Sequence, residues 1–383
     1  MKTSAIYFVA LLLSVLMACQ NNSKPAPSPA NTTADSLAVP TPTPIVEKRV
    51  AGAPVILIVR TAEAHVYERP DFDAPILSNY QQGDSLTFTN RITQQHSSRQ
   101  LEGFTYKEPW LRVILPNQQM AWVYGPTVNF DAQLQPALAE LVLYPRVAAL
   151  FGPSLAQQIG LYQKEQAINH SMPGFRTLYS RAQNIKDSLE LYLDHFMNTN
   201  PATASTDFFW LNELLDGLLL HYIPEQKKYY LFRDLKVWQR LSQQTPAPED
   251  DAFVEVLLAA YPSDSISYYY YGWQLPLEEN NFCSLLGSDI HAQVLAQLNK
   301  ALDSNSYFLP ELQQIQQAVL NDITTTNQYW MPLPAVQQEL QTILAQNYPF
   351  LDRGNLIALK TKQSFLEAPD KHDLVLNLFE GEE

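Results

Sequence analysis

Residues 54 to 130 alternate hydrophobic and polar side chains over short stretches, with turn-forming residues between the stretches. Alternation with a period of two residues is typical of strands that bury one face. Two of the stretches flank the turn at 116–118, which predicts a hairpin. Strands are predicted at Val55–Arg60, Ser85–Thr93, Trp110–Leu115 and Met120–Tyr124. Closely spaced short strands predict a small barrel or sandwich.

From residue 131 onward, apolar side chains recur every three or four residues, as in helices that bury one face. The stretch Asp207–Tyr222 is almost continuously apolar, which predicts a central helix nearly surrounded by others. Proline at a helix start is favourable because its missing N–H is not needed there. Further helices are predicted at Arg176–Met197, Tyr230–Gln243 and Asp251–Tyr261, and after Ser288, Pro310 and Pro334.

These patterns predict a multidomain α+β chain. A small β-barrel is expected at residues 54–130, followed by a larger all-α helical domain at residues 131–383. The polar segment at 243–251 is the best position for a subdivision of the helical domain. The length of 383 residues and a hydrophobic fraction of 46% agree with more than one folded domain.

The first nineteen residues carry an export pattern. Lys2 precedes an apolar run that ends at Met17, which fits the core of a signal peptide and is shorter than the ~20 residues that span a bilayer. The run ends in Leu16-Met17-Ala18-Cys19, which resembles the bacterial lipobox. This resemblance implies a signal peptide at residues 1–18 and a lipid on Cys19; an ordinary signal peptide that contains a cysteine is the alternative. Residues 19–53 are rich in Pro, Thr and Ala, which predicts a disordered tether.

The residues after Cys19 bear on its destination. The segment Gln20–Lys24 lacks the aspartate associated with retention at the inner membrane. It also lacks the acidic cluster associated with surface export in the Bacteroidetes-type lipoproteins that the chain resembles. The resemblance implies a lipid anchor in the outer membrane, facing the periplasm. The membrane is thus the first expected partner.

Five short motifs follow one another in the strand-rich part of the chain. They are Val66-Tyr67-Glu68-Arg69-Pro70, Ala74-Pro75-Ile76-Leu77, Gln82-Gly83-Asp84-Ser85-Leu86, Trp110-Leu111-Arg112-Val113 and Ala121-Trp122-Val123-Tyr124. Their order and spacing resemble the bacterial Src-homology-3-like (SH3-like) domain, although the Arg-Ser-Gly of the first turn is replaced and polar residues are inserted around 94–102. The resemblance implies attachment to cell-wall peptide or glycan, or to a protein partner. The candidate ligand-binding residues are Tyr67, Arg69, Trp110, Trp122 and Tyr124. By analogy with the family, Tyr67 and Arg69 lie in the loop that commonly lines the ligand groove, whereas Trp110 and Trp122 are core or rim residues.

The charge and the motif content narrow the classes of function. With 25 Lys and Arg against 39 Asp and Glu, the net charge is −14, and no basic stripe is present, so nucleic acid is not an expected partner. The sequence contains no Gly-rich phosphate loop, no His-Glu-x-x-His motif and no cysteine pair, so no cofactor and no metal are expected. Convergence of Asp216, His221 and Glu225 in space remains open.

Two groups of residues are candidate catalytic centres. Cys283 and Ser284 keep only part of the Asp-Cys-Ser-Gly motif of cell-wall cysteine peptidases, so an inert core thiol is favoured. Glu213 and Asp216 stand three residues apart on the predicted central helix, where each would raise the pKa of the other. They are the alternative acid–base pair; a solvated stripe, or pairing with Arg233 or Arg240, is the favoured interpretation.

The segment Ser267–Trp273 contains four consecutive tyrosines. Exposed aromatic rings can hold sugar rings, and the same rings can fill gaps between helices. In an extended chain, Tyr269, Tyr271 and Trp273 would share one side, which makes them candidate saccharide-binding residues. Packing between helices is the favoured interpretation.

The sequence therefore predicts a membrane-anchored envelope lipoprotein that acts as a noncatalytic binding or scaffold module. Peptidoglycan or an envelope protein would be its partner. The alternative is an envelope enzyme that acts on a cell-wall or saccharide substrate through Glu213 and Asp216 in the helical domain.

Overall fold

The computed structural model describes residues 45–199, 207–261, 265–268, 270–277, 282–304, 307–369 and 373–376. The predicted signal peptide, Cys19 and most of the predicted tether lie outside these residues. Residues from Ile45 to Glu383 form one compact unit. No helix in the described ranges is both long and apolar enough to cross a bilayer.

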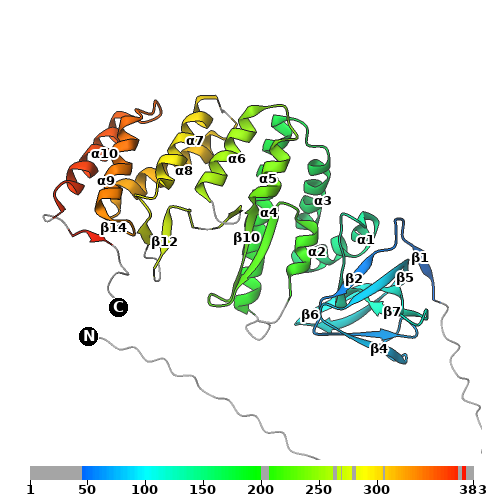
Figure 1. The fold of residues 1–383 in the computed structure, drawn as a ribbon. Helices are drawn as coiled ribbons and strands as arrows, with labels where there is room; N and C mark the ends of the chain where they lie inside the picture. Colours follow the sequence, from blue (N-terminus) through cyan, green and yellow to red (C-terminus); the bar gives the residue numbers. More distant parts are fainter. Residues whose placement is uncertain are drawn as a thin grey trace, which may run out of the picture. The chain divides into compact units, whose positions relative to one another are not determined.

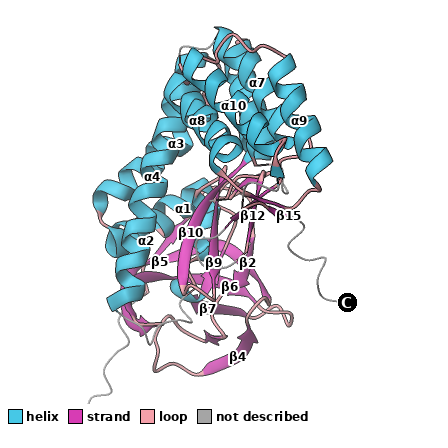
Figure 2. Ribbon diagram, turned by 90° about the vertical axis from the view of Figure 1, so that its left-hand side faces the viewer, coloured by secondary structure: helices cyan, strands magenta, loops and turns pink. Residues whose placement is uncertain are grey.

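The first part of this unit is a curled antiparallel sheet (Figures 1 and 2). Its order is β4-β3-β7-β6-β5-β2-β8, and β1 pairs with β5. The strands are β1 (Glu47–Arg49), β2 (Ile56–Val59), β3 (Glu63–Tyr67), β4 (Ile76–Gln81), β5 (Ser85–Leu101), β6 (Phe104–Ile114), β7 (Met120–Tyr124) and β8 (Val128–Asn129).

The long hairpin of β5 and β6 gives the sheet its size. The register between these strands shifts on both sides of Ile92, and such irregularities bend a strand and increase its twist. The hairpin closes at Glu102 and Gly103, which both have positive φ. Residues 94–102, expected as an inserted loop, instead lie mostly in the extended β5.

The expected small SH3-like barrel followed by an all-α domain is therefore wrong. The sheet has eight strands and is a sizeable barrel-like structure. The helical part also contains two further sheets, so the described structure is α+β throughout. A loop was predicted at residues 94–102 because these residues are polar. Thr, Ser, Gln and His also occur in the exposed strands of a long hairpin, so polarity alone does not separate a strand from a loop here.

Helices that are neighbours in sequence pack against each other in the second part of the unit (Figure 1). Those predicted after Ser288, Pro310 and Pro334 are confirmed as α7, α8 and α9, and the prediction at 176–197 is confirmed within α4. The helices are α1 (Pro136–Leu141), α2 (Leu143–Phe151), α3 (Pro153–Ala167), α4 (Met172–Thr199), α5 (Leu235–Ser242), α6 (Pro248–Ala260), α7 (Ile290–Ser304), α8 (Leu309–Thr325), α9 (Leu333–Ala345) and α10 (Arg353–Leu366).

The predicted central helix at 207–222 is wrong. The segment forms a 3-10 helix, η3 (Phe209–Leu214), and then the strand β9 (Leu218–Ile223). Strand β10 (Lys228–Asp234) pairs with β9 and with β11 (Ile266–Ser267). Short apolar runs fit a buried strand as well as a buried helix, and Gly217, with φ of 91°, breaks the segment. A second small sheet joins β12 (Gln274–Pro276), β13 (Phe282–Ser284), β14 (Gln328–Tyr329) and β15 (Val375–Leu376).

One hydrophobic core runs from the curled sheet through the helices. Buried side chains from Val50 to Leu366 belong to a single contiguous cluster. At the junction, the ring of Phe104 in β6 stacks on Phe196 in α4 at 4.3 Å between centroids and meets Phe208 edge-on. Burial of this apolar area stabilises the sheet and the helices together.

The first strand is attached to the sheet by a short ladder and by charges. Residues 47–49 of β1 pair with Arg91–Thr93 of β5. The carboxylate of Glu47 accepts hydrogen bonds from Arg91 at 2.9 Å and from Arg112 at 3.1 Å. Glu47 thus links β1 to both strands of the long hairpin.

Candidate functional site

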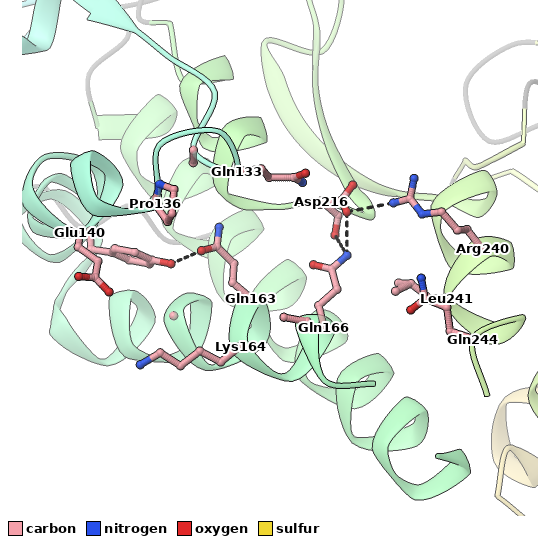
Figure 3. A pocket seen from close by; sticks show the side chains of 14 residues that line it. Gln133, Pro136, Glu140, Gln163, Lys164, Gln166, Asp216, Arg240, Leu241 and Gln244 are labelled. Carbon is pink, nitrogen blue, oxygen red and sulfur yellow. Dashed lines mark hydrogen bonds and ion pairs between the residues drawn. The ribbon is translucent and has the colours of Figure 1, made fainter. Parts of the chain in front are cut away.

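A pocket of about 450 Å³ lies between α1, α3 and α5, beside the turn that joins η3 to β9 (Figure 3). This size suits a small organic ligand or a few residues of a peptide. Apolar surface makes up slightly more than half of its lining, and amide, hydroxyl and charged side chains make up the rest. Its polar side chains are Gln133, Glu140, Tyr144, Gln163, Lys164, Gln166, Asp216, Arg240 and Gln244.

Asp216 stands at the centre of the polar wall (Figure 3). Its carboxylate accepts hydrogen bonds from Gln166 Nε2 at 2.9 Å and from Arg240 Nη2 at 3.2 Å. Its backbone carbonyl accepts a hydrogen bond of 2.5 Å from the Tyr162 hydroxyl. Asp216 is therefore fixed in place as a hydrogen-bond acceptor whose charge is compensated by Arg240.

The turn after Asp216 depends on Gly217. With φ of 91°, it has a backbone conformation that other residues rarely adopt. Its carbonyl accepts a hydrogen bond of 2.9 Å from Trp238 Nε1 in α5. An added Cβ would lie 3.0 Å from the Tyr162 hydroxyl, a tight contact that this hydroxyl would have to relieve by shifting. The turn therefore holds α3 and α5 at the two sides of the pocket.

The opposite wall carries hydroxyl and amide groups. The Tyr144 hydroxyl is hydrogen-bonded to Gln163 Oε1, and Gln163 Nε2 donates to the carbonyl of Leu214 at 3.0 Å. Burial raises the pKa of Tyr144, and the charge of Glu140 raises it further. Tyr144 therefore stays a neutral hydroxyl at physiological pH and acts only as a hydrogen-bonding group.

The alternative acid–base pair does not form one centre. Glu213 Oε1 accepts a hydrogen bond of 3.2 Å from Asn129 in β8, whereas Asp216 is bonded to α3 and α5. The pKa of Glu213 is raised by burial and by the charge of Asp131, and the bond from Asn129 partly opposes this rise. The two carboxylates thus have different partners, because η3 ends at Leu214 before Asp216 is reached.

Four aromatic residues that the sequence suggests as ligand-binding lie inside a second hydrophobic cluster. Tyr67, Trp110, Trp122 and Tyr124 are each at most 5% exposed. The Tyr124 hydroxyl shares its single proton between the carbonyls of Ser97 and Tyr106, at 2.8 and 2.9 Å. A ligand would reach these rings only if the hairpin or the loop over them moved.

The loop from β3 to β4 covers this second cluster. Phe72 packs on Trp110 with 4.8 Å between ring centroids and meets Tyr124 edge-on at 5.0 Å. Arg99 places its guanidinium 4.8 Å from the centre of the Phe72 ring. Arg69 is exposed at the surface of the same loop and is the one sequence-suggested residue of this group that solvent reaches freely.

The residues of the tyrosine-rich segment have two roles: some pack inside the protein, and some line a second pocket. Tyr269 lies outside the described residues. Trp273 is fully buried, and Tyr271 stacks on it with 4.3 Å between centroids. Tyr261 stacks on Tyr271 at 5.4 Å. The packing interpretation therefore describes Trp273, while Tyr271 also lines a pocket.

A buried polar network lies beside Cys283, the thiol that the sequence suggests as a candidate nucleophile. Ser284 Oγ donates to Asp322 at 2.6 Å, and His291 Nε2 lies 2.9 Å from the same carboxylate. Burial raises the pKa of Cys283 to about 11, so the thiol stays protonated. A Ser-His-Asp triad needs the histidine between the other two groups, whereas here the aspartate is central. This network fastens β13, α7 and α8 to one another.

Three residues that shape the pocket were not singled out from the sequence. Tyr162, Gln163 and Gln166 share α3. Tyr162 and Gln166 bond to Asp216 and Gln163 bonds to Leu214, and each of these contacts spans some fifty residues of chain. Pattern analysis of one sequence cannot place such distant groups together. Within the described ranges, no three His, Cys, Asp or Glu side chains converge as a metal site, and this includes the grouping around His221.

No protein-family model matches the chain, and no curated protein or solved structure shows significant similarity to it. The functional proposal therefore rests on the geometry of the described residues and on the export pattern of the sequence.

Proposed function

We propose that the chain is a noncatalytic binding protein of the cell envelope, anchored in the outer membrane by a lipid on Cys19 and facing the periplasm. Its ligand is a peptide-bearing polymer of the envelope, with peptidoglycan as the first candidate. The pocket around Asp216 holds a short stretch of that peptide. The lipobox-like sequence at Leu16–Cys19 supports the anchor.

One observation carries the binding role: the carboxylate of Asp216 is held between Gln166 and Arg240 in an open pocket with both polar and apolar lining. A carboxylate held in this way presents fixed acceptor oxygens that can orient a ligand. The glutamine side chains offer both donors and acceptors, which match the N–H and C=O groups of a peptide. Lys164 and Glu140 add opposite charges that match a peptide with ionised ends.

The enzyme alternative would need two acids on one substrate. Glu213 and Asp216 have separate partners, so the geometry favours binding over acid–base chemistry. An envelope protein is the other partner class that the sequence leaves open, and the experiment below separates it from peptidoglycan.

The test is co-sedimentation of residues 45–383 with purified peptidoglycan. We expect the protein in the pellet, and we expect Lys164→Ala/Arg240→Ala to shift most of it to the supernatant. Both changed side chains are exposed at the pocket, so folding should be kept. Arg353→Ala/Lys360→Ala removes the same charge from exposed positions of α10 and is the matched control.

Each outcome is decisive. Loss with the pocket variant and retention with the control support the proposal. Equal retention of both variants means that the wall binds elsewhere and removes the pocket from the proposal. If the unchanged protein stays in the supernatant, peptidoglycan is excluded as the ligand, and a protein partner becomes the next candidate.

A further inference from the structure

A second pocket, of about 500 Å³, lies between α4, β10, α6 and α8. It shares no lining residue with the Asp216 pocket. Its walls combine tyrosine rings, amide side chains and one arginine. The residues used below are Tyr179, Gln183, Arg233, Tyr261, Tyr271 and Gln314.

Arg233 is the unusual member of this pocket. Among the described arginines that are not exposed, it alone lacks a carboxylate partner; the others are Arg60, Arg112, Arg146, Arg176 and Arg181. One N–H, on Nη2, donates to Gln183 Oε1, and the guanidinium lies 4.9 Å from the centre of the Tyr179 ring. Its other two nitrogens, Nε and Nη1, bond to no described residue and are not sealed from solvent.

This pairing fixes the guanidinium and leaves part of its donor edge open to the pocket. The Tyr179 ring covers one face, and Gln183 limits rotation about the end of the side chain. A guanidinium that is held flat on an aromatic ring presents coplanar donors, which match the two oxygens of a carboxylate. The pocket therefore favours an anionic group at Arg233.

The rest of the lining suits a ligand that carries hydroxyl groups better than a flat apolar ligand. Tyr271 has one face on Trp273 and the other on Tyr261, so its ring offers an edge and a hydroxyl. Tyr261 and Tyr271 both line the pocket, and the charge of Arg233 acts on both hydroxyls. Side-chain amides from α4 and α8 complete the polar wall.

The pocket also contains one carboxylate of its own. Glu311 lines it from α8 and is paired with Arg176. This pair is neutral as a unit, so the charge of Arg233 stays uncompensated.

We propose that this pocket binds a hydroxylated carboxylate of the sugar-acid class, with Arg233 holding the carboxylate and the tyrosine hydroxyls and amides holding the ring hydroxyls. The site is independent of the peptide pocket and of the function proposed for it, because the two pockets share no residue.

The test is isothermal titration calorimetry of residues 45–383 with three probes: D-glucuronate, D-glucose and inorganic phosphate. We expect binding of glucuronate, at least about tenfold weaker binding of glucose because the charge-assisted bonds are lost, and weaker binding of phosphate because the hydroxyls are lost. Equal binding of glucose, tighter binding of phosphate, or no binding of glucuronate would each overturn the proposal.

Substitutions of lining residues test whether glucuronate binds in this pocket. Arg233→Gln should weaken glucuronate binding at least about tenfold. Because this change also removes the contact with Tyr179, a second variant is needed: Gln314→Glu adds a negative charge at an exposed position of the lining and should weaken glucuronate binding while the melting temperature stays unchanged. Arg353→Gln, at an exposed arginine of α10, is the control. Unchanged binding in Gln314→Glu or an equal loss in the control would contradict the assignment.

Discussion

Arg146 in α2 donates two hydrogen bonds to the carboxylate of Glu108 in β6, from Nε to Oε1 at 2.7 Å and from Nη2 to Oε2 at 2.8 Å. The guanidinium also donates to the carbonyl of Gly125 and lies 5.0 Å from the centre of the Trp210 ring. Both charged side chains are almost fully buried, at 0% and 5% exposure. A strand of the curled sheet and a helix of the second part are thus joined by a desolvated ion pair.

Glu108→Ala should lower the free energy of unfolding by about 3–5 kcal/mol, because it leaves the guanidinium of Arg146 buried without its counter-charge. Urea unfolding of residues 45–383 measures the loss. Glu165→Ala is the matched control: it breaks a two-bond pair with Arg181 that is partly exposed, so its cost should stay below about 1 kcal/mol. Equal costs for the two changes would mean that burial of the Arg146 pair has no consequence.

Gly217→Ala should destabilise the protein by about 1–3 kcal/mol, because it adds both backbone strain and a contact of 3.0 Å with the Tyr162 hydroxyl. Gly83→Ala separates the two causes: Gly83 has nearly the same φ, of 89°, but an added Cβ there would meet no atom within 4 Å. Thermal unfolding of both variants should therefore show the larger loss at Gly217. A larger loss at Gly83 would refute the role given to the contact with Tyr162.

Glu213→Gln should stabilise the protein at neutral pH by less than about 1 kcal/mol. Burial and the charge of Asp131 raise the pKa of Glu213 in the folded protein, so ionisation costs more there than in the unfolded chain. The cost is absent at pH values below the ordinary pKa of 4.5 and grows as the pH rises through the raised pKa. The amide oxygen of glutamine can still accept the bond from Asn129. Urea unfolding at pH 4 and pH 7 should show the advantage of the variant only at pH 7; an advantage that is equal at both values would contradict the assignment.

Lys362 predicts a pH dependence on the alkaline side. Burial lowers its pKa to about 8, an effect that the charge of Asp322 partly opposes, whereas the unfolded chain has the ordinary value of 10.5. Between these values the unfolded chain binds more protons, so stability rises with pH there. The ammonium donates to the carbonyl of Thr326 and to Asn327 Oδ1. Unfolding at pH 7.5 and 9.5 should show the wild-type protein gaining relative to Lys362→Met; a difference that does not change with pH would disprove the lowered pKa.

The helices α8 and α9 were predictable because their apolar stripes recur over several turns and a proline, Pro310 or Pro334, lies in the first turn of each. The segment around Gly217 was not, because a short apolar run has no period that separates a strand from a helix. The C-terminal half of β5 was not predicted for a different reason. Its residues are almost all polar, so the strand pairs with β6 without the alternation of hydrophobic and polar residues that indicates a strand.

The candidate site was predictable only in part. The sequence suggested Asp216 and named Arg240 as a possible partner, and the structure confirms that pair at 3.2 Å. Gln166 and Tyr162 could not be foreseen, because only the fold brings α3 to the turn at Gly217. Tyr271 was suggested for its ring face, whereas the structure shows both faces covered.

The short strand β1 has a mechanical consequence. Any tension that reaches the compact unit along the chain from its N-terminal side acts first on residues 47–49 and on the carboxylate of Glu47, which is tied to Arg91 and Arg112. The three paired residues and the carboxylate of Glu47 stabilise β1 far less than the continuous core stabilises the rest of the unit. Under tension, β1 would therefore detach from β5 while the rest of the unit stays folded. Under load, the protein would lengthen by a few residues before its pockets are disturbed.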